Sequence, residues 1–216
     1  MTTKYGVLIA LEGLDGSGKS TMAAHLTRYY QSHGLNVLQT AEPGGTDLGR
    51  QLREILLSDA GASLSHTTQA LLLATARRHH VETVIQPALA RGQLILCDRF
   101  TLSTRVYQST CTELDTLIDI GARDIVPDLT LVLDIDYATA RQRLGKRTGV
   151  DLNHFDEAHE SLFNIRRGIL NDWVEKNRNT CLRIHASHPQ SIVQETAEMY
   201  INDLLAELRF FTPASA

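Results

Sequence analysis

The sequence has few cysteines, no excess of basic charge and no long apolar run, and each shortage excludes a class of protein. Its three cysteines are odd in number and lack C-x-x-C spacing, so they predict reduced thiols in the cytoplasm rather than disulfides or a zinc site. The formal net charge of −4 provides no basic surface for nucleic acid. No run approaches the ~20 apolar residues of a membrane helix, and Glu12 interrupts the apolar N-terminal run before it resembles a signal peptide.

What is present is a regular alternation of β-like and helix-like segments, the pattern of a parallel sheet with helical crossovers. The five expected strands are residues 7–11, 36–40, 94–97, 129–134 and 181–184. The clearest expected helices are residues 19–33, a helix capped by Asp47, residues 67–91 with a kink at Pro87, and residues 189–208. Because no linker, repeat or low-complexity tract interrupts this order, we expect one α/β domain over residues 1–216.

The most specific segment is a complete G-x-x-x-x-G-K-[ST] phosphate-binding loop between an expected strand and an expected helix. It reads Gly13-Leu14-Asp15-Gly16-Ser17-Gly18-Lys19-Ser20 and is followed by Thr21. Glycines allow consecutive backbone N–H groups to point into one concavity, and the helix N-terminus adds positive partial charge there. Lys19 is expected to reach the terminal phosphates and the Ser20 hydroxyl to hold Mg²⁺. These residues predict a site for a nucleoside triphosphate.

Two further segments favour a kinase among the proteins with such a loop. Asp98-Arg99 directly follows the apolar strand 94–97, at the sheet edge where ligands gather. An aspartate there can hold Mg²⁺, while the arginine can bind a second anionic group. The chain has no Asn-Lys-x-Asp segment of the kind that reads guanine. A basic stretch that carries Arg141, Arg143, Lys146 and Arg147 is typical either of a solvated helix face or of a lid over migrating phosphate.

Over nearly its whole length the chain resembles the bacterial branch of the thymidylate kinase family. The matching segments are residues 12–21, Glu42-Pro43-Gly44-Gly45-Thr46, 71–74 with Arg77, 80–89, Asp98-Arg99-Phe100 with Ser103, Tyr107-Gln108 and 127–130. The resemblance implies a P-loop NTPase-type three-layer sandwich, with a five-stranded parallel sheet, flanking helices and a short helical lid at about residues 141–156. It also implies transfer of the γ-phosphoryl group of ATP to dTMP with Mg²⁺, by a homodimer.

The resemblance also implies which residues bind the acceptor nucleotide. These are Asp15, Glu42, Arg53, Leu73, Arg77, Arg99, Ser103, Tyr107 and Gln108. Arg99 and Arg53 are expected to hold the acceptor phosphate, and Arg77 to bind its base. Asp15 is expected to contact the sugar 3′-hydroxyl, and Tyr107 to crowd the 2′ position. Glu42 is expected to help organise both the Mg²⁺ and the acceptor region.

The same resemblance implies that a lid cation joins Lys19 and Arg99 in catalysis. In the bacterial branch the phosphate loop has no arginine, and here Gly16 occupies the position that an arginine takes in the other branch. Arg143, Lys146 and Arg147 are therefore the candidates, with Arg147 favoured. The metal is expected on Ser20 and Asp98.

Three positions depart from the usual pattern of the family. Leu73 stands where a phenylalanine usually stacks on thymine, and residues 109–113 replace a glycine-rich loop that contains arginine. Residues 151–156 lack the usual arginine of the lid. Two alternatives therefore stay open: a kinase for dUMP or a modified pyrimidine deoxynucleotide, and a catalytically weakened nucleotide-binding protein.

Overall fold

The computed structural model describes residues 6–146, 155 and 159–210, and within them the five expected strands all form. They are β1 (Val7–Glu12), β2 (Val37–Ala41), β3 (Leu94–Asp98), β4 (Leu129–Asp134) and β5 (Cys181–His185). The helices before β4 are α1 (Lys19–Ser32), α2 (Asp47–Leu57), α3 (Asp59–Ala62), α4 (His66–His80), η1 (Val81–Ile85), α5 (Gln86–Ala90), α6 (Thr101–Tyr107) and α7 (Leu114–Ala122). After β4 come α8 (Tyr137–Gly145), α9 (Glu160–Lys176) and α10 (Gln190–Glu207).

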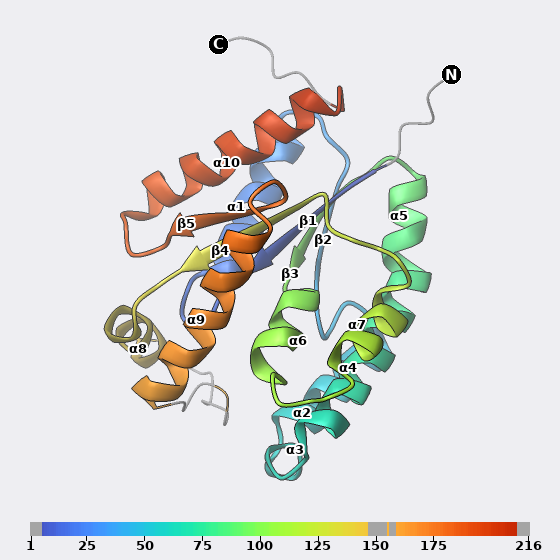
Figure 1. Ribbon diagram of the computed structural model, residues 1–216. Helices are drawn as coiled ribbons and strands as arrows, with labels where there is room; N and C mark the ends of the chain where they lie inside the picture. The colour runs from blue at the N-terminus through green and yellow to red at the C-terminus, as the bar shows by residue number, and fades with distance from the viewer. Residues whose placement is uncertain (1–5, 147–154, 156–158, 211–216) are drawn as a thin grey trace.

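The strands form one parallel sheet in the order β2-β3-β1-β4-β5, so the central strand β1 pairs with both β3 and β4. Helices α1 and α10 cover one face of this sheet, and η1, α5 and α9 lie on the other (Figure 1). This three-layer arrangement confirms the expected fold class. The strand order reverses at β1, and such a switch point is where α/β sheets bind ligands, outside the carboxyl ends of the strands.

Strand β1 is apolar at consecutive positions because both of its faces are buried. Val7, Ile9 and Leu11 pack into the core cluster that includes Leu26 of α1. Leu8 and Ala10 point to the opposite side and pack with residues of η1 and α5. Side chains alternate across a strand, and a strand covered by helices on both faces therefore reads as a continuous apolar run.

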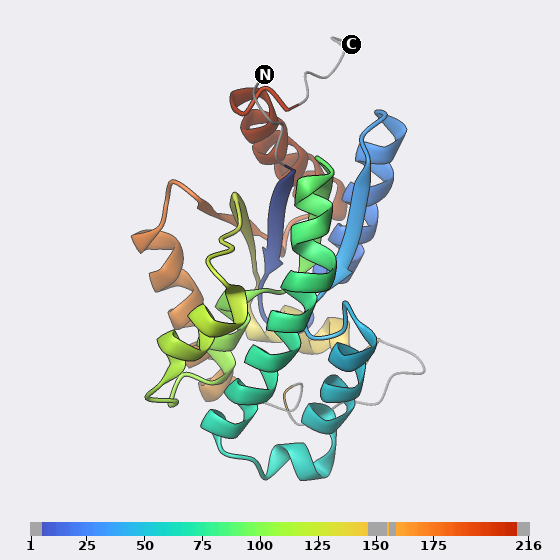
Figure 2. The ribbon, with the colours of Figure 1, turned by 90° about the vertical axis from the view of Figure 1, so that its right-hand side faces the viewer.

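The long helix expected at residues 67–91 is present as α4, η1 and α5, which follow one another along the length of the molecule (Figure 2). The expected irregularity at Pro87 takes the form of a π-helical turn, η1, just before it. Proline has no N–H and its ring clashes with the carbonyl four residues earlier, and a π turn is one way to relieve both. The prediction that Asp47 caps α2 is wrong: Thr46 is the cap, and its hydroxyl accepts a bond from the N–H of Gly49 at 3.0 Å.

Only part of the expected lid lies within the described residues. Of the expected lid, α8 covers the beginning and Phe155 is described, whereas Arg147 and residues 151–154 lie outside the described ranges.

Among the helices of the described part of the chain, none combines the length and the apolar character that a membrane crossing requires.

Candidate active site

The phosphate loop connects β1 to α1 with the geometry that its sequence predicts. The Nζ of Lys19 is buried and donates a hydrogen bond of 3.0 Å to the carbonyl of Leu14, so the lysine lies along the loop. Burial, and secondarily the positive charge of Arg99, lowers the pKa of Lys19 to about 8. A Cβ atom at Gly16 would lie 2.8 Å from the carbonyl oxygen of Ala140 in α8. This close approach leaves no space for the arginine found at this position in the other branch of the family.

The expected metal ligands are adjacent. The Oγ of Ser20, at the start of α1, donates to Oδ2 of Asp98, at the end of β3, over 2.5 Å. The other carboxylate oxygen, Oδ1 of Asp98, is buried and has no hydrogen-bond partner. A hydroxyl and a carboxylate are oxygen donors of the kind that Mg²⁺ prefers, and an unpaired buried carboxylate oxygen is costly without a cation or donor. The residues present therefore fit the ion.

Asp15 and Arg99 form an ion pair between the phosphate loop and the end of β3. Arg99 also donates to the Gly13 carbonyl at 3.3 Å and to Ser103 Oγ at 3.1 Å. Burial opposes the charge of Arg99, but Asp15 and other nearby acidic groups outweigh it and raise the pKa of this guanidinium. Arg99 has a φ of 70°, in the left-handed region that non-glycine residues rarely occupy and that clusters at functional sites.

Arg166 is a cation at this site that sequence reasoning missed. Its guanidinium, from α9, lies 4.6 Å from the ring centroid of Tyr107, and Arg99 lies 5.3 Å from the centroid of the same ring. Burial lowers the pKa of Arg166, and the charge of Arg99 lowers it further, whereas Tyr107 and Asp15 act in the opposite direction. Both guanidiniums lie against one ring, so an anionic ligand beside it would be stabilised by both charges. The signal was weak, because Arg166 belongs to no motif and its position depends on the packing of α9.

One cleft brings all of the expected acceptor-binding residues together. It is lined by Asp15, Glu42, Pro43, Arg53, Leu56, Leu57, Leu73, Ala76, Arg77, Arg99, Phe100, Ser103, Thr104, Tyr107, Gln108 and Phe155. All nine expected residues are in this set. Nη1 of Arg77 and Oε1 of Gln108 are buried atoms without a partner, one a donor and the other an acceptor. A polar base that presents both kinds of group would satisfy them.

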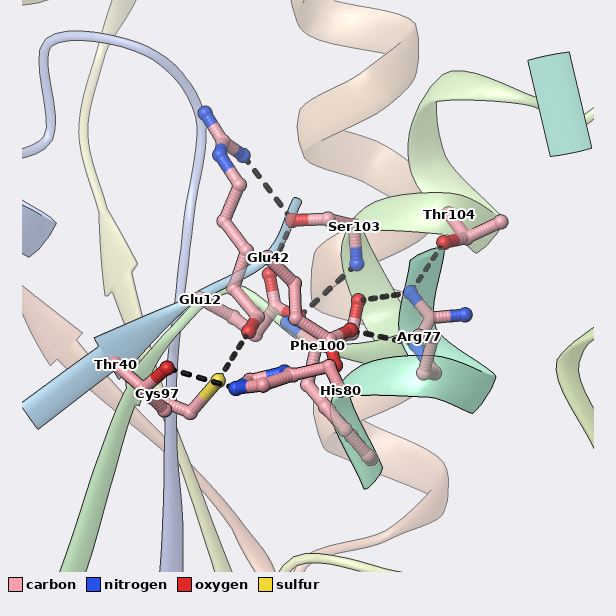
Figure 3. Close-up of polar contacts among 10 residues, drawn as sticks. Glu12, Thr40, Glu42, Arg77, His80, Cys97, Phe100, Ser103 and Thr104 are labelled. Carbon is pink, nitrogen blue, oxygen red and sulfur yellow. Dashed lines mark hydrogen bonds and ion pairs between the residues drawn. The ribbon is translucent and has the colours of Figure 1, made fainter. Parts of the chain in front are cut away.

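Both carboxylate oxygens of Glu42 have partners on helix α4. Its Oε2 accepts from Nε of Arg77 at 2.6 Å, and its Oε1 lies 2.9 Å from Nδ1 of His80 (Figure 3). Both oxygens are thus engaged by Arg77 and His80. Glu42 lines the acceptor cleft, and its expected part in organising the Mg²⁺ and acceptor region stays a prediction.

A second carboxylate, Glu12, orders the segment after β3, and sequence reasoning gave it no role. Its Oε1 accepts from the backbone N–H groups of Phe100 at 2.8 Å and Ser103 at 3.1 Å. Its Oε2 accepts from the Ser103 hydroxyl at 2.5 Å (Figure 3). An acidic residue at the end of a buried apolar strand was the available signal, since such a carboxylate must find donors.

The lid cations are only partly described. Nη2 of Arg143 donates to the carbonyl of Ala186 at 2.8 Å. The same arginine lines a second cleft together with Ser17, Gly18 and Thr21 of the phosphate-loop segment. Arg143 therefore lies on the donor side of the site, away from the Arg99 and Tyr107 pair. Lys146 is exposed at the end of α8, and Arg147, the favoured candidate, lies outside the described residues.

The comparisons with known proteins agree on one family. The sequence model described as thymidylate kinase matches residues 11–197. A thymidylate kinase from Leifsonia xyli is 41% identical over 214 residues, which cover 96% of this chain and 95% of that protein. One from Clavibacter sepedonicus is 39% identical, with 94% and 93% covered. The crystal structure of thymidylate kinase from Ehrlichia chaffeensis superposes with a TM-score of 0.73 at 27% identity, covering 91% of this chain and 99% of that one.

Proposed function

The chain belongs to the thymidylate kinase family, and we propose that it transfers the γ-phosphoryl group of ATP to dTMP, forming dTDP and ADP. The observation that carries this proposal is the single connected site formed by the phosphate loop and the acceptor cleft. Asp15 lies on the loop and lines the cleft, and it is paired with Arg99, which lines the cleft as well. A donor and an acceptor nucleotide bound at these two places would meet at the carboxyl ends of β1 and β3.

The transfer is a direct in-line displacement. An oxygen of the dTMP phosphate forms a bond to the γ-phosphorus, and the bond to the β–γ bridging oxygen breaks, so that ADP leaves with the electron pair. Phosphate monoesters are anionic near neutral pH, so this oxygen needs no strong general base. Lys19 neutralises charge on the donor phosphates, while Arg99 and Arg53 align the acceptor phosphate. Mg²⁺, held by Ser20 and Asp98, would contribute charge neutralisation at the donor phosphates.

The transition-state cation is supplied by Arg166 together with Arg99 in the described part of the chain. Both guanidiniums lie against Tyr107, and Arg166 lines a small cleft with Leu14 and Asp15 of the phosphate loop. Phosphoryl transfer gains from fixed positive charge around the migrating group. Arg143 would serve in the donor cleft, where a planar guanidinium can contact the donor nucleotide. A role for Arg147 remains a prediction.

We also propose a homodimer in a reducing, cytoplasmic setting. Leu48 and Ile55 of α2, Leu71 of α4 and Ile120 of α7 are exposed apolar side chains on neighbouring helices, and a second copy would cover them. The three cysteines are buried and free. Sedimentation of the wild type and of Ile55→Glu tests the dimer, because a charge at this face would yield monomers if the face is the interface.

The experiment for the main proposal is a coupled assay of the purified chain with ATP, Mg²⁺ and a panel of nucleoside monophosphates. We expect turnover of dTMP in the wild type and its loss in Lys19→Ala, with Lys176→Ala as a surface control. If another pyrimidine deoxynucleotide is phosphorylated and dTMP is not, that nucleotide is the acceptor in place of dTMP. No transfer to any monophosphate, with ATP still bound, would identify a binding protein instead.

A further inference from the structure

A chain of buried polar contacts leads away from the acceptor cleft. Oγ1 of Thr40, in β2, lies 2.7 Å from Nε2 of His80, the last residue of α4. Nδ1 of His80 lies 2.9 Å from Oε1 of Glu42, and Oε2 of Glu42 lies 2.6 Å from Nε of Arg77. The His80 side chain is only 2% exposed. Figure 3 shows the four side chains in succession, with the imidazole between the hydroxyl and the carboxylate.

The direction of these hydrogen bonds follows from the groups themselves. A carboxylate only accepts hydrogen bonds, so Nδ1 of His80 is the protonated ring nitrogen and donates to Oε1 of Glu42. In the neutral ring Nε2 is then an acceptor, and the Thr40 hydroxyl donates to it. The Glu42 carboxylate thus selects the tautomer of His80, the Thr40 hydroxyl pairs with the other ring nitrogen, and the imidazole held at both nitrogens prevents rotation of the Glu42 carboxylate.

These contacts hold the guanidinium of Arg77 in one orientation. Its Nε is held by Glu42, and its Nη2 donates to the Phe100 carbonyl at 3.1 Å and to Thr104 Oγ1 at 2.8 Å. Its Nη1 is buried without a partner, and Arg77 lines the acceptor cleft. The guanidinium is planar, so fixing Nε and Nη2 also fixes where the Nη1 donors point.

The turn that carries Glu42 is fitted to the same imidazole. A Cβ atom at Gly45 would lie 2.2 Å from Nε2 of His80 and 2.6 Å from Oγ1 of Thr40. Only a glycine allows the backbone to approach this closely. His80 therefore contacts the Glu42–Thr46 turn at two places, through the Glu42 carboxylate and through the backbone of Gly45.

We propose that His80 is a positioning residue for recognition of the acceptor base, acting through Glu42 on Arg77 without touching the nucleotide. This inference rests on the proposed function. Arg77 Nη1 can only donate, so it favours a base with a carbonyl oxygen at this place and disfavours one with an amino group. If the Arg77 guanidinium were free to change orientation, the protein would bind dTMP less tightly and would discriminate less between dTMP and dCMP.

The test is steady-state kinetics of His80→Leu with dTMP, dCMP and ATP. Because the substitution removes one fixed contact to Glu42, we expect KM for dTMP to rise about tenfold and the preference for dTMP over dCMP to fall by a similar factor. The kcat and the KM for ATP should stay within about twofold of the wild type. His80→Asn keeps an N–H toward Glu42 and should recover part of the affinity. Thr40→Val should raise KM for dTMP, while its matched control Thr40→Ser should not.

A double-mutant cycle separates positioning from a merely structural role. Lysine has no planar guanidinium for Glu42 to orient. In an Arg77→Lys background, His80→Leu should therefore no longer change KM for dTMP. An equal effect of His80→Leu on KM in both backgrounds overturns the inference, and so does an unchanged KM in the single variant. In either case, turnover of dTMP by the wild type still supports the proposed function. If the wild type does not phosphorylate dTMP, the proposed function fails, and this inference fails with it.

Discussion

The hydroxyl of Tyr107 donates a hydrogen bond of 2.7 Å to Oδ2 of Asp15, which joins α6 to the phosphate loop. Burial raises the pKa of Tyr107 well above its usual value, and the charge of Asp15 raises it further. The phenol is therefore protonated at neutral pH and available as a donor. The same Asp15 is paired with Arg99, so this carboxylate receives donors from two elements.

We expect Tyr107→Phe to lower kcat/KM for dTMP about tenfold, because Asp15 loses one of the donors that orient it. The ring remains in this variant, so discrimination against the ribonucleotide acceptor should persist. Tyr107→Ala removes the ring, and this discrimination should then fall. Steady-state kinetics with dTMP and ribothymidine monophosphate measures both effects. Equal discrimination in Tyr107→Ala and wild type would contradict a role of the ring near the 2′ position.

Arg166→Met is expected to lower kcat about 100-fold, because it removes positive charge beside the migrating phosphoryl group. Methionine preserves part of the side-chain volume against Tyr107. The matched control is Arg178→Met, whose side chain is 73% exposed and is paired only at the surface with Glu175. Rapid-quench measurement of the transfer step compares the variants. An unchanged transfer rate in Arg166→Met would leave the residues outside the described ranges as the source of the cation.

The pH dependence of ATP binding should report on Lys19. Its pKa of about 8 means that the lysine of the free protein loses its charge above pH 8, so affinity for ATP should fall there. From pH 7.5 to 9.5 the charged fraction decreases about 25-fold, and the KM for ATP should rise accordingly. Lys19→Arg, which keeps its charge, should show a flat profile over this range. A flat profile in the wild type would argue against the lowered pKa.

The same shift has a consequence for stability with a definite sign. Between pH 8 and 10.5 the unfolded chain still binds a proton at Lys19 that the folded protein has released. The contribution of Lys19 to the free energy of unfolding therefore rises with pH in this window. The difference between wild type and Lys19→Met in chemical denaturation at pH 7.5 and 10 measures it.

Leu73→Phe tests the departure at the base-binding cleft. An aromatic ring at this wall would stack on thymine, so we expect KM for dTMP to fall about threefold with little change in kcat. The neighbouring Leu72→Phe is a control, because Leu72 does not line the cleft. A higher KM in Leu73→Phe would mean that the cleft around Phe100 and Tyr107 has no room for another ring.

Most of the fold was predictable because its signals are local. The apolar run of β1, the glycines of the phosphate loop and the helical pattern from Lys19 occur within one short segment, and each depends on near neighbours in the chain. The residues expected to bind the acceptor were named through a resemblance carried by ordered motifs, and all of them line one cleft. The contacts of Arg166 and Glu12 were missed, since the sequence does not specify the partner of either residue.

By itself the sequence determined the α/β class, the phosphate loop and the presence of an acidic and a basic residue at the end of β3. Only the tertiary structure decided what each charged side chain contacts. Glu42 meets Arg77 across 35 positions through packing of α4 beside the turn after β2, and Asp15 meets Arg99 across 84 through the pairing of β1 with β3. Local spacing determines which face of an element a residue occupies, but the partner of a buried charge depends on which other element packs against that face.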